Sequence, residues 1–466
     1  MPSLKTPIPN DPMTRTISYH PVLVKPNEDE IILKYVMWIG LGAHISLDRK
    51  HLGRYILQKN NPDRTDEIIE SGIKKYRDGV IPKHVHEDLS SGKCLKVILD
   101  YSSEGYYDID FGYVSKIFGI EPSKLMWITG IWDPKFLDEG NEITIIWRNF
   151  WERFLNQKLN EKTELNSLEV VFNEDRQVKE SVAVKGLRQQ LQDIKELRTR
   201  KYHGLCYNRQ PHNHRIQLMT RLKSEGVIDQ TAYSWGGLYQ GDEESYWSDP
   251  LNVDNELRVH KENGFLTDLD DEAFLETIKS PRIEFEGEDL THNKAHSINF
   301  DHIKECYFQI ITETMFINAK PLENGIQPTP FLSEKSYKPF ISGMPFVMFG
   351  QTGTVKALRK QNYNCYDRWI NHDYDDIIDD AERFQAALEE TVRLSLIPTE
   401  TWNSMLKDML PYIKTNISQF NKNSIETMSH TEFGKFSVNY DTDGLTVRQE
   451  IYPDPDVLKY CFSEIT

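Results

Sequence analysis

The sequence contains little cysteine, and the cysteines are spread along the chain. Five occur in 466 residues, at positions 94, 206, 306, 365 and 461, and no two have the short spacing of a CxxC pair. An odd number of dispersed cysteines argues against a disulfide framework and against a zinc site, and favours a reducing compartment. We therefore expect a cytoplasmic protein without a metal site.

Long hydrophobic runs are also absent. The longest, at 35–41 and 344–349, are much shorter than the roughly 20 apolar residues of a membrane-spanning helix. The N-terminal stretch MPSLKTPIPNDPMTR is rich in proline and lacks the apolar centre of a signal peptide. We expect no association with a membrane.

Acidic residues outnumber basic ones in the chain as a whole, but not in every segment. The net charge of −17 argues against a protein that coats nucleic acid. Residues 148–223, however, hold 16 Lys/Arg against 9 Asp/Glu, whereas residues 225–289 hold 4 against 18. The basic span is a candidate for contact with phosphates, and the alternative for both spans is an ordinary solvated face.

Strand-like and helix-like segments alternate in both halves of the chain. Apolar runs at 31–41, 94–100 and 123–130 are separated by polar or helical stretches, and the same rhythm resumes at 202–208 and 306–316. Such alternation is typical of mostly parallel sheets covered by helices. We predict an α/β fold with two successive Rossmann-like domains.

Polar side chains follow three predicted strands of the second half. Ligands of open α/β sheets bind beyond the carboxyl ends of the strands, where helix N-termini also point. The sequence has no GxGxxG or GxxxxGK[ST] motif at a strand–helix junction, which argues against the best-known dinucleotide and P-loop sites. The candidate binding residues are Asn208, Arg209 and Arg215 after the first strand, Thr312 and Glu313 in the second, and Ser333, Glu334, Lys335 and Lys338 at the third.

The third of these positions begins with the sequence FLSEK, in which an acid and a base start a predicted helix. Ser333 is a natural N-cap, which places Glu334 and Lys335 in the first turn. Glu334 suits the helix dipole and Lys335 does not. An approaching anion such as a diphosphate would explain the lysine, and Glu334 would then accept hydrogen bonds from ribose hydroxyls. The alternative is a solvated ion pair without function.

The histidines at 212 and 214 resemble a metal-binding HxH pair. No cysteine or carboxylate cluster completes the set. We expect them to lie near a phosphate pocket or to be exposed, rather than to bind a metal.

The stretch SEKSYKPFISGMPFVMFG resembles the donor-binding motif of GT-B glycosyltransferases. It is similar in particular to fucosyltransferase-like enzymes, where T-E-K precedes a helix and P-V-V-L-G. Together with NRxPHxHR at 208–215, it also looks like predicted glycosyltransferases of tailed phages and large viruses. The resemblance covers mainly 200–370, and the spacing before the proline is slightly shorter here. The matching residues are Ser333, Glu334, Lys335, Gly343, Pro345, Val347 and Gly350.

This resemblance implies two facing Rossmann-like domains, as in GT-B enzymes, with a cleft between them. It implies a nucleotide-sugar donor of the UDP or GDP type and no further cofactor. Glu334 and Lys335 would contact the nucleotide sugar, and Arg209 or Arg215 would contact phosphate. No DxD-like metal motif lies in a convincing loop, since the acidic run DYDDIIDD at 373–380 resembles the approach to a helix. A metal-independent transfer is therefore expected, with Lys and Arg neutralising the diphosphate.

The first domain would hold the acceptor and, in an inverting enzyme, a carboxylate base that takes the proton of the attacking hydroxyl. Glu104 lies in the loop YSSEGYY next to Gly105 and is the preferred candidate. Asp100 ends the preceding strand, with capping of the following turn as the alternative role. His44, after the GLGAH loop, is a further candidate.

The phage-like resemblance favours one acceptor, a 5-hydroxymethylated pyrimidine in double-stranded DNA within the host cytoplasm. A glycan or lipid-linked acceptor is the alternative, and a non-catalytic nucleotide-sugar-binding protein is the alternative of another class. Aromatic side chains in the basic span could stack on an extruded base, although their spacing also fits a core. The basic residues are Arg148, Arg153, Lys185, Arg188, Lys195, Arg198, Arg200 and Lys201, and the aromatic ones are Trp147, Phe150, Trp151 and Phe154.

The expected organisation follows from these segments. It comprises an extended N-terminal arm at 1–30, an acceptor-side domain at 31–198, a nucleotide-sugar-binding domain at 199–395 with an acidic, loop-like insertion at 239–295, and a helical segment and tail at 396–466.

Overall fold

The computed structural model divides into two compact units, which are described separately. The first contains residues 1–150, 321–328 and 426–466, and the second contains 151–320 and 329–425. The structure describes residues 17–27, 30–39, 70, 81–101, 111–132, 143–147, 155, 182–208, 211–237, 250–280, 283, 298–318, 329–429, 434–441 and 444–451.

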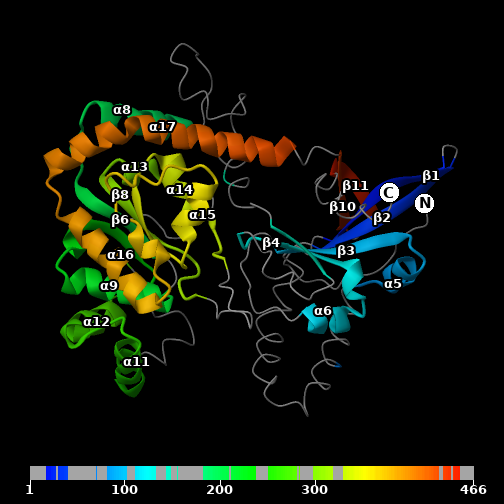
Figure 1. Ribbon diagram of the computed structural model, residues 1–466, viewed down its shortest axis with the longest axis horizontal. Coiled ribbons are helices and arrows are strands. Elements are labelled where there is room, and N and C mark those ends of the chain that lie inside the picture. The colour runs from blue at the N-terminus through cyan, green and yellow to red at the C-terminus, as the bar shows by residue number, and fades with distance from the viewer. Residues whose placement is uncertain are drawn as a thin grey trace. The chain divides into compact units, whose positions relative to one another are not determined.

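The first unit is built on a five-stranded sheet in which the strands follow chain order (Figure 1). Its first strand is antiparallel to the second, and the other neighbours are parallel. The first strand lies within the segment expected as an extended arm. The strands are β1 (Ile17–Asn27), β2 (Glu30–Ile39), β3 (Cys94–Tyr101), β4 (Leu125–Thr129) and β5 (Thr144–Trp147). The helices are α5 (Lys83–Ser90), α6 (Phe111–Phe118) and the short η5 (Pro122–Lys124), and β10 (Gly434–Asp441) pairs with β11 (Gly444–Ile451).

The second unit has a four-stranded parallel sheet in the order β7-β6-β8-β9. Every residue of β8 and β9 is buried, as expected for strands of a parallel sheet with helices on both faces. The strands are β6 (Tyr202–Asn208), β7 (Thr231–Trp235), β8 (Cys306–Thr312) and β9 (Phe346–Phe349). Both predicted α/β halves thus contain a parallel sheet with helices.

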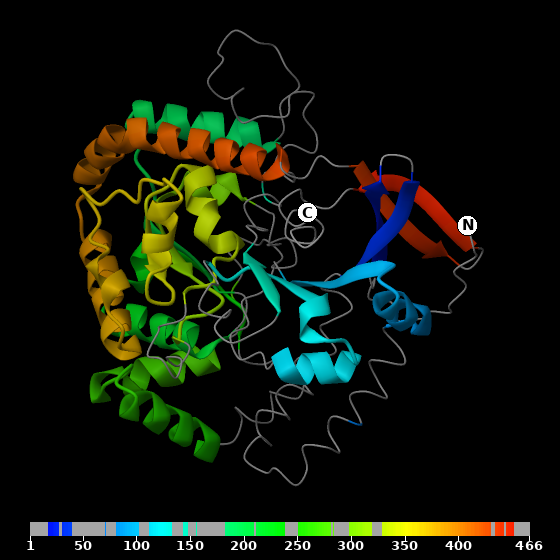
Figure 2. The ribbon, with the colours of Figure 1, turned by 45° about the vertical axis from the view of Figure 1, so that its right-hand side comes forward.

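Helices cover both faces of this second sheet. On one face, α9 and α12 pack around Trp235, and on the other, α13 packs against Ala232. Helices α8 and α17 lie side by side in both views (Figures 1 and 2), and a Cβ added at Gly343 would lie within 4 Å of Leu187 of α8 and Ile413 of α17. The helices are α8 (Val182–Lys195), α9 (Asn213–Ser224), α11 (Pro250–Glu262), α12 (Asp271–Lys279), α13 (Phe300–Ile303), α14 (Glu334–Ser342), α15 (Thr354–Lys360), α16 (Asp380–Ser395) and α17 (Thr399–Ser429), with short turns η8 (Ile228–Gln230), η9 (Asp268–Asp270) and η12 (Asp373–Asp376).

Two features differ from the expected organisation. Helix α8 belongs to the second unit, whereas the sequence placed the boundary after residue 198. The acidic segment at 239–295 was expected to be a loop, yet it contains α11 and α12. Phe274 and Ile278 of α12 are buried beside Trp235, and the acidic residues of this helix occupy its first turn or its other faces. Helices α11 and α12 of this segment therefore contribute to the core.

The strand order of the second unit creates a topological switch point. From β6 the chain moves outward to β7, then crosses back to β8 on the opposite side of β6. The loops that leave the carboxyl ends of β6 and β8 therefore diverge, which is where open α/β sheets bind ligands. In the first unit, the described strands follow each other without such a reversal.

Candidate ligand-binding site

Two polar side chains lie at the carboxyl ends of β6 and β8, the strands that flank the switch point. Asn208 ends β6 and Thr312 ends β8, and the Thr312 hydroxyl donates a hydrogen bond of 2.8 Å to the Asn208 Oδ1. Both residues are almost completely buried. The structure thus brings these two predicted binding residues together, but each has an internal partner.

Glu313 directly follows β8 in the sequence, and its side chain is hydrogen-bonded to the beginning of α14. Its side chain is fully buried. The carboxylate accepts hydrogen bonds from the backbone N–H of Thr314 at 2.9 Å, from the backbone N–H of Ser333 at 3.3 Å and from the hydroxyl of Ser336 at 2.6 Å. A carboxylate in this position also complements the positive end of the helix dipole. Glu313, predicted to bind the donor, therefore positions the turn from which other side chains extend.

The N-terminal turn of α14 has the predicted capping. The Ser333 hydroxyl accepts a hydrogen bond from the backbone N–H of Lys335 at 3.2 Å. The helix ends at Ser342, and Gly343 adopts the left-handed conformation with φ of 68°, as is usual for a glycine that follows a helix. Both predicted ends of this helix are confirmed.

Glu334 and Lys335 form an ion pair across this turn. The Lys335 Nζ lies 2.9 Å from the Glu334 Oε1. It also donates to the hydroxyls of Thr314 at 3.2 Å and Ser333 at 3.3 Å. The lysine is therefore folded back onto the turn, with 26% of its side chain exposed.

The ionisation of this turn is set by burial and by the two lysines. Burial alone would raise the pKa of Glu334, but the charges of Lys335 and Lys338 outweigh it and the pKa is lowered. Burial lowers the pKa of Lys338 to about 8, although Glu334 opposes the shift. At neutral pH the Glu334 carboxylate is therefore ionised, and Lys338 is mostly protonated.

Helix α9 supports the same loop with Arg215 and His214. The Arg215 guanidinium donates to the carbonyls of Thr312 at 3.2 Å and Glu313 at 3.4 Å. Burial lowers the pKa of Arg215, against the opposing charges of Glu313 and others. Arg215 is only 4% exposed, so it contributes positive charge from beneath the loop.

His214 is buried and acts as a neutral donor. Its Nε2 lies 3.0 Å from the Glu313 carbonyl, which can only accept, so Nε2 carries the hydrogen. Burial, followed by the charges of Arg215 and His212, holds the pKa of His214 well below its usual range. The ring stacks on Phe316 at 5.5 Å. The two histidines of the HxH pair thus differ, with His212 exposed and His214 in the core.

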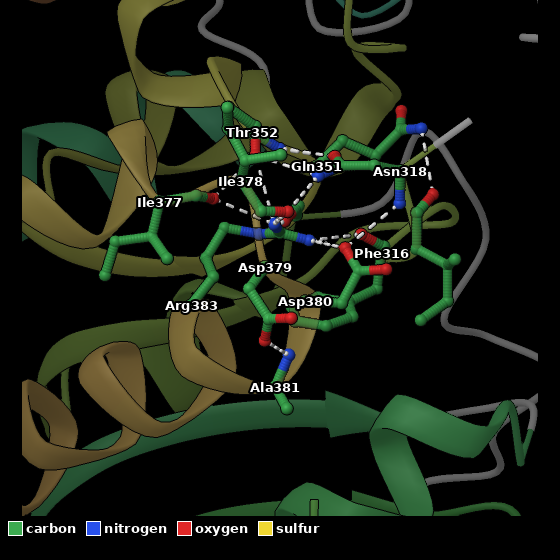
Figure 3. Close-up of polar contacts among 12 residues, drawn as sticks. Phe316, Asn318, Gln351, Thr352, Ile377, Ile378, Asp379, Asp380, Ala381 and Arg383 are labelled. Atoms are coloured by element: carbon green, nitrogen blue, oxygen red, sulfur yellow. Dashed lines mark hydrogen bonds and ion pairs between the residues drawn. The ribbon is translucent and has the colours of Figure 1, made fainter. Parts of the chain in front are cut away.

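A second buried arginine, Arg383 of α16, clamps the loops at this edge of the sheet (Figure 3). The residue is 1% exposed. Its guanidinium also pairs with Asp380 and lies over the ring of Phe316. It donates to the carbonyls of Phe316 at 2.8 Å, Gly350 at 3.0 Å, Ile377 at 3.0 Å and Ile378 at 3.2 Å, and to the Thr352 hydroxyl at 3.0 Å.

Asn318 and Gln351 extend this network toward α14. The Asn318 amide donates to the Ile378 carbonyl at 2.7 Å, and its oxygen accepts from the backbone N–H of Thr352 at 3.0 Å. The Gln351 amide bridges the Ile317 carbonyl at 3.1 Å and, through its oxygen, the backbone N–H of Phe331 at 3.2 Å. The loops after β8 and β9 and before α14 are therefore connected by side chains that the sequence analysis did not identify.

The basic span proposed to meet DNA is only partly available for that role. Arg200 is 5% exposed and donates to the carbonyls of Ile303 at 3.0 Å and Cys306 at 2.8 Å. This arginine was expected to line a groove, but its side chain is buried and hydrogen-bonded to backbone carbonyls of the protein interior. Arg198 pairs with Asp193 at 2.8 Å.

Several predicted residues lie outside the described residues. They are Arg209, Glu104, His44, Arg148, Arg153, Phe150, Trp151 and Phe154. Asp100 and Trp147 belong to β3 and β5, but only their backbone is described. The proposed catalytic base therefore stays a prediction.

The described residues contain neither a metal-binding cluster nor a helix able to span a membrane. They contain no group of three or more His, Cys, Asp and Glu side chains placed to hold a metal ion. None of the helices in the described ranges combines the length and hydrophobicity needed to cross a membrane. In comparisons with known proteins, no family model, no curated protein and no solved structure matches this chain.

Proposed function

We propose that the chain is a glycosyltransferase that moves a sugar from a nucleotide-sugar donor to an acceptor hydroxyl. The observation that carries the proposal is the N-terminal turn of α14 at the switch point, where Glu334, Lys335 and Lys338 meet. The turn offers an acceptor for sugar or ribose hydroxyls and cations for a diphosphate. Its sequence is also the one that resembles the donor motif of GT-B enzymes.

In the proposed reaction, the acceptor oxygen attacks the anomeric carbon while the bond to the diphosphate breaks. The acceptor proton passes to a carboxylate base, for which Glu104 is preferred and Asp100 is the second candidate. Lys335 and Lys338, together with the dipole of α14, balance the charge of the departing diphosphate without requiring a metal. Arg215 adds positive charge from below.

A rigid frame supports this use of the turn. Glu313 holds Ser333 and Ser336, and Arg383 holds the neighbouring loops by hydrogen bonds to their carbonyls. Such internal contacts reduce the freedom that a ligand would otherwise have to remove on binding.

Calorimetry with nucleoside diphosphates tests the proposal. We expect UDP or GDP to bind, and Lys335→Ala to weaken binding by about 1.5–3 kcal/mol, the contribution of a charge-assisted hydrogen bond. Lys261→Ala is the matched control, because Lys261 is also paired, with Asp268 at 2.9 Å, and its side chain is 24% exposed. Absence of heat with every nucleoside diphosphate and every nucleotide sugar would remove the basis of the proposal.

Catalysis is tested by nucleotide release. A screen of nucleotide sugars with candidate acceptors should liberate the nucleotide and add a sugar mass to the acceptor. Glu104→Gln should abolish release while leaving donor binding nearly intact. Donor binding without turnover on any acceptor would instead indicate a non-catalytic nucleotide-sugar-binding protein.

The proposed acceptor is a 5-hydroxymethylated pyrimidine in duplex DNA. Its support is the resemblance to predicted phage enzymes together with the exposed lysines Lys185, Lys195 and Lys201 of the basic span. Transfer to a glycan, but never to such DNA, would decide against this acceptor.

A further inference from the structure

The Lys335 ammonium is fully engaged by the first turn of α14 and by the loop that follows β8. An ammonium group has three N–H donors. Its three hydrogen-bond partners are the Glu334 carboxylate at 2.9 Å and the hydroxyls of Thr314 at 3.2 Å and Ser333 at 3.3 Å. The structure therefore describes a closed arrangement in which groups of the protein itself occupy all three donors of this cation.

Glu334 is the anionic partner in this arrangement. The residue is 9% exposed, and its Oε1 accepts a hydrogen bond from the Lys335 ammonium at 2.9 Å. A neutral hydroxyl that approached this carboxylate would have to compete with an ammonium ion. Both would donate to a charged oxygen, but only the ammonium adds the attraction of its own positive charge, so the hydroxyl is the weaker competitor.

A phosphate acts differently from a hydroxyl, because it competes with Glu334 for the Lys335 ammonium. A diphosphate carries more charge than one carboxylate and offers several acceptor oxygens, so it can draw the Lys335 ammonium away from Glu334. Lys338, four residues further along α14, still favours the ionised form of Glu334 through its positive charge. The carboxylate is then available to ligand hydroxyls.

We propose that the Lys335–Glu334 pair is a latch that makes recognition of the donor's hydroxyl groups conditional on its phosphates. The proposal rests on the proposed nucleotide-binding function and adds a rule of specificity to it. Nucleosides are rejected because they cannot open the latch, whereas nucleoside diphosphates open it as they bind. Lys335 thus has two opposite effects, attraction of the diphosphate and exclusion of the bare nucleoside.

The test compares two matched ligand pairs, UDP with uridine and GDP with guanosine, on the full chain. Calorimetry measures the diphosphates, and ligand-observed NMR measures the weaker nucleosides. In Lys335→Met we expect the diphosphate to bind about tenfold more weakly and the nucleoside about tenfold more tightly, since one charge-assisted contact is lost in the first case and one competing contact in the second. The preference for the diphosphate should therefore fall by about a hundredfold.

A second variant keeps both charges. Thr314→Val removes one acceptor of the Lys335 ammonium and so weakens only the closed arrangement. We expect it to raise the affinity for both nucleoside and diphosphate by about threefold. A lysine that merely contacts phosphate would not produce this joint gain. Adding Glu334→Gln to Lys335→Met should abolish the gain in nucleoside affinity.

Lys261→Met controls for the loss of a similarly exposed, ion-paired lysine, and circular dichroism checks that each variant is folded. The latch is overturned if nucleoside affinity is unchanged or lower in both Lys335→Met and Thr314→Val while diphosphate binding to the wild type is intact. Failure of the wild type to bind any nucleoside diphosphate would overturn the proposed function as well, so the two failures are distinguishable.

Discussion

Several polar residues at the edge of the second sheet fix loops in place through hydrogen bonds to the backbone. Arg383 is the clearest case, because its hydrogen bonds go to loops that leave two different strands and to the turn before its own helix. Removing a buried cation leaves several carbonyls and the Asp380 carboxylate without their partner, and each unsatisfied buried group destabilises the fold.

We predict that Arg383→Met lowers the free energy of unfolding by about 3–5 kcal/mol, the range found when one member of a buried ion pair is removed. Urea denaturation followed by fluorescence measures the change. Arg258→Met is the control, since Arg258 and Glu262 are both 59% exposed, and exposed pairs of this kind contribute about 0.3–0.5 kcal/mol. Similar losses in both variants would contradict the role of Arg383 as a clamp.

A buried histidine makes stability depend on pH. The His372 Nε2 lies 2.9 Å from the Cys365 carbonyl and its Nδ1 lies 2.7 Å from the Tyr374 hydroxyl. Burial lowers the pKa of His372 to about 4, from an ordinary value of 6.5. The unfolded chain therefore binds one more proton than the folded chain between these values, and stability falls as the pH drops through that window.

We predict that the wild type loses about 2 kcal/mol more stability than His372→Gln between pH 7 and pH 5, because the slope for one proton is about 1.4 kcal/mol per pH unit below 6.5. Urea denaturation at the two pH values measures the difference. Buried His214 contributes to both proteins and cancels in the comparison. Equal losses in the two proteins would show that His372 is not the source.

At the scale of whole elements, the end of α14 couples three helices. Gly343 has a positive φ of 68°, and a Cβ added there would lie 3.0 Å from the Ile413 Cγ2 of α17 and 3.7 Å from the Leu187 Cδ1 of α8. Gly226, which follows α9, has a similar φ of +70° but nothing within 4 Å. The two glycines thus share a backbone requirement and differ in packing.

We predict that Gly226→Ala destabilises the protein by about 1 kcal/mol, the strain of a left-handed alanine, and that Gly343→Ala destabilises it by about 1–3 kcal/mol more because of overpacking. Thermal unfolding of both variants measures the two effects. If the two variants melted at the same temperature, the contact of α14 with α8 and α17 would contribute little.

The same helix shows how far a sequence can predict an element. Its first and last residues were predicted correctly because both signals are local, a serine before the first turn and a glycine after the last. Helices α11 and α12 were missed because acidic residues dominate 239–295, although Phe274 and Ile278 have helical spacing. In that segment the acidic composition predicts a loop, whereas the spacing of the apolar residues predicts a helix.

The site was predictable only in its outline. The strand-end position of Asn208, Thr312 and Glu313 follows from the alternation of strands and helices. The Glu313 carboxylate accepts hydrogen bonds from the beginning of α14, and Arg383 binds a carbonyl 67 residues away. Both depend on tertiary contacts that leave no local signal in the sequence. The sequence therefore predicts which edge of the sheet carries the polar side chains, and not which of them remain available to a ligand.

The charge of the whole molecule constrains its proposed partner. A net charge of −17 repels DNA at long range, so binding to a duplex must depend on a local group of cations. We predict that duplex DNA carrying 5-hydroxymethylcytosine binds with affinity that falls steeply with salt, and that replacing Lys185, Lys195 and Lys201 by Gln reduces the slope of log K against log salt by up to about 3. Fluorescence anisotropy across a salt series measures the slope.

The control replaces Lys356, Lys360 and Lys407, which are equally exposed and lie in the same unit. Equal slopes in the two triple variants would mean that the basic span does not contact the duplex. Salt-independent binding of the wild type would argue for an uncharged acceptor such as a glycan.

The cysteines, scarce as they are, provide the protein with native reporters of local opening. The four that the structure describes are buried, Cys94 in the first unit and Cys206, Cys306 and Cys365 in the second. Burial raises the pKa of the Cys94 and Cys206 thiols to about 12, so they react with alkylating reagents only after the surrounding structure opens. The order in which mass spectrometry finds these thiols modified would reveal which sheet opens first, without any label being introduced.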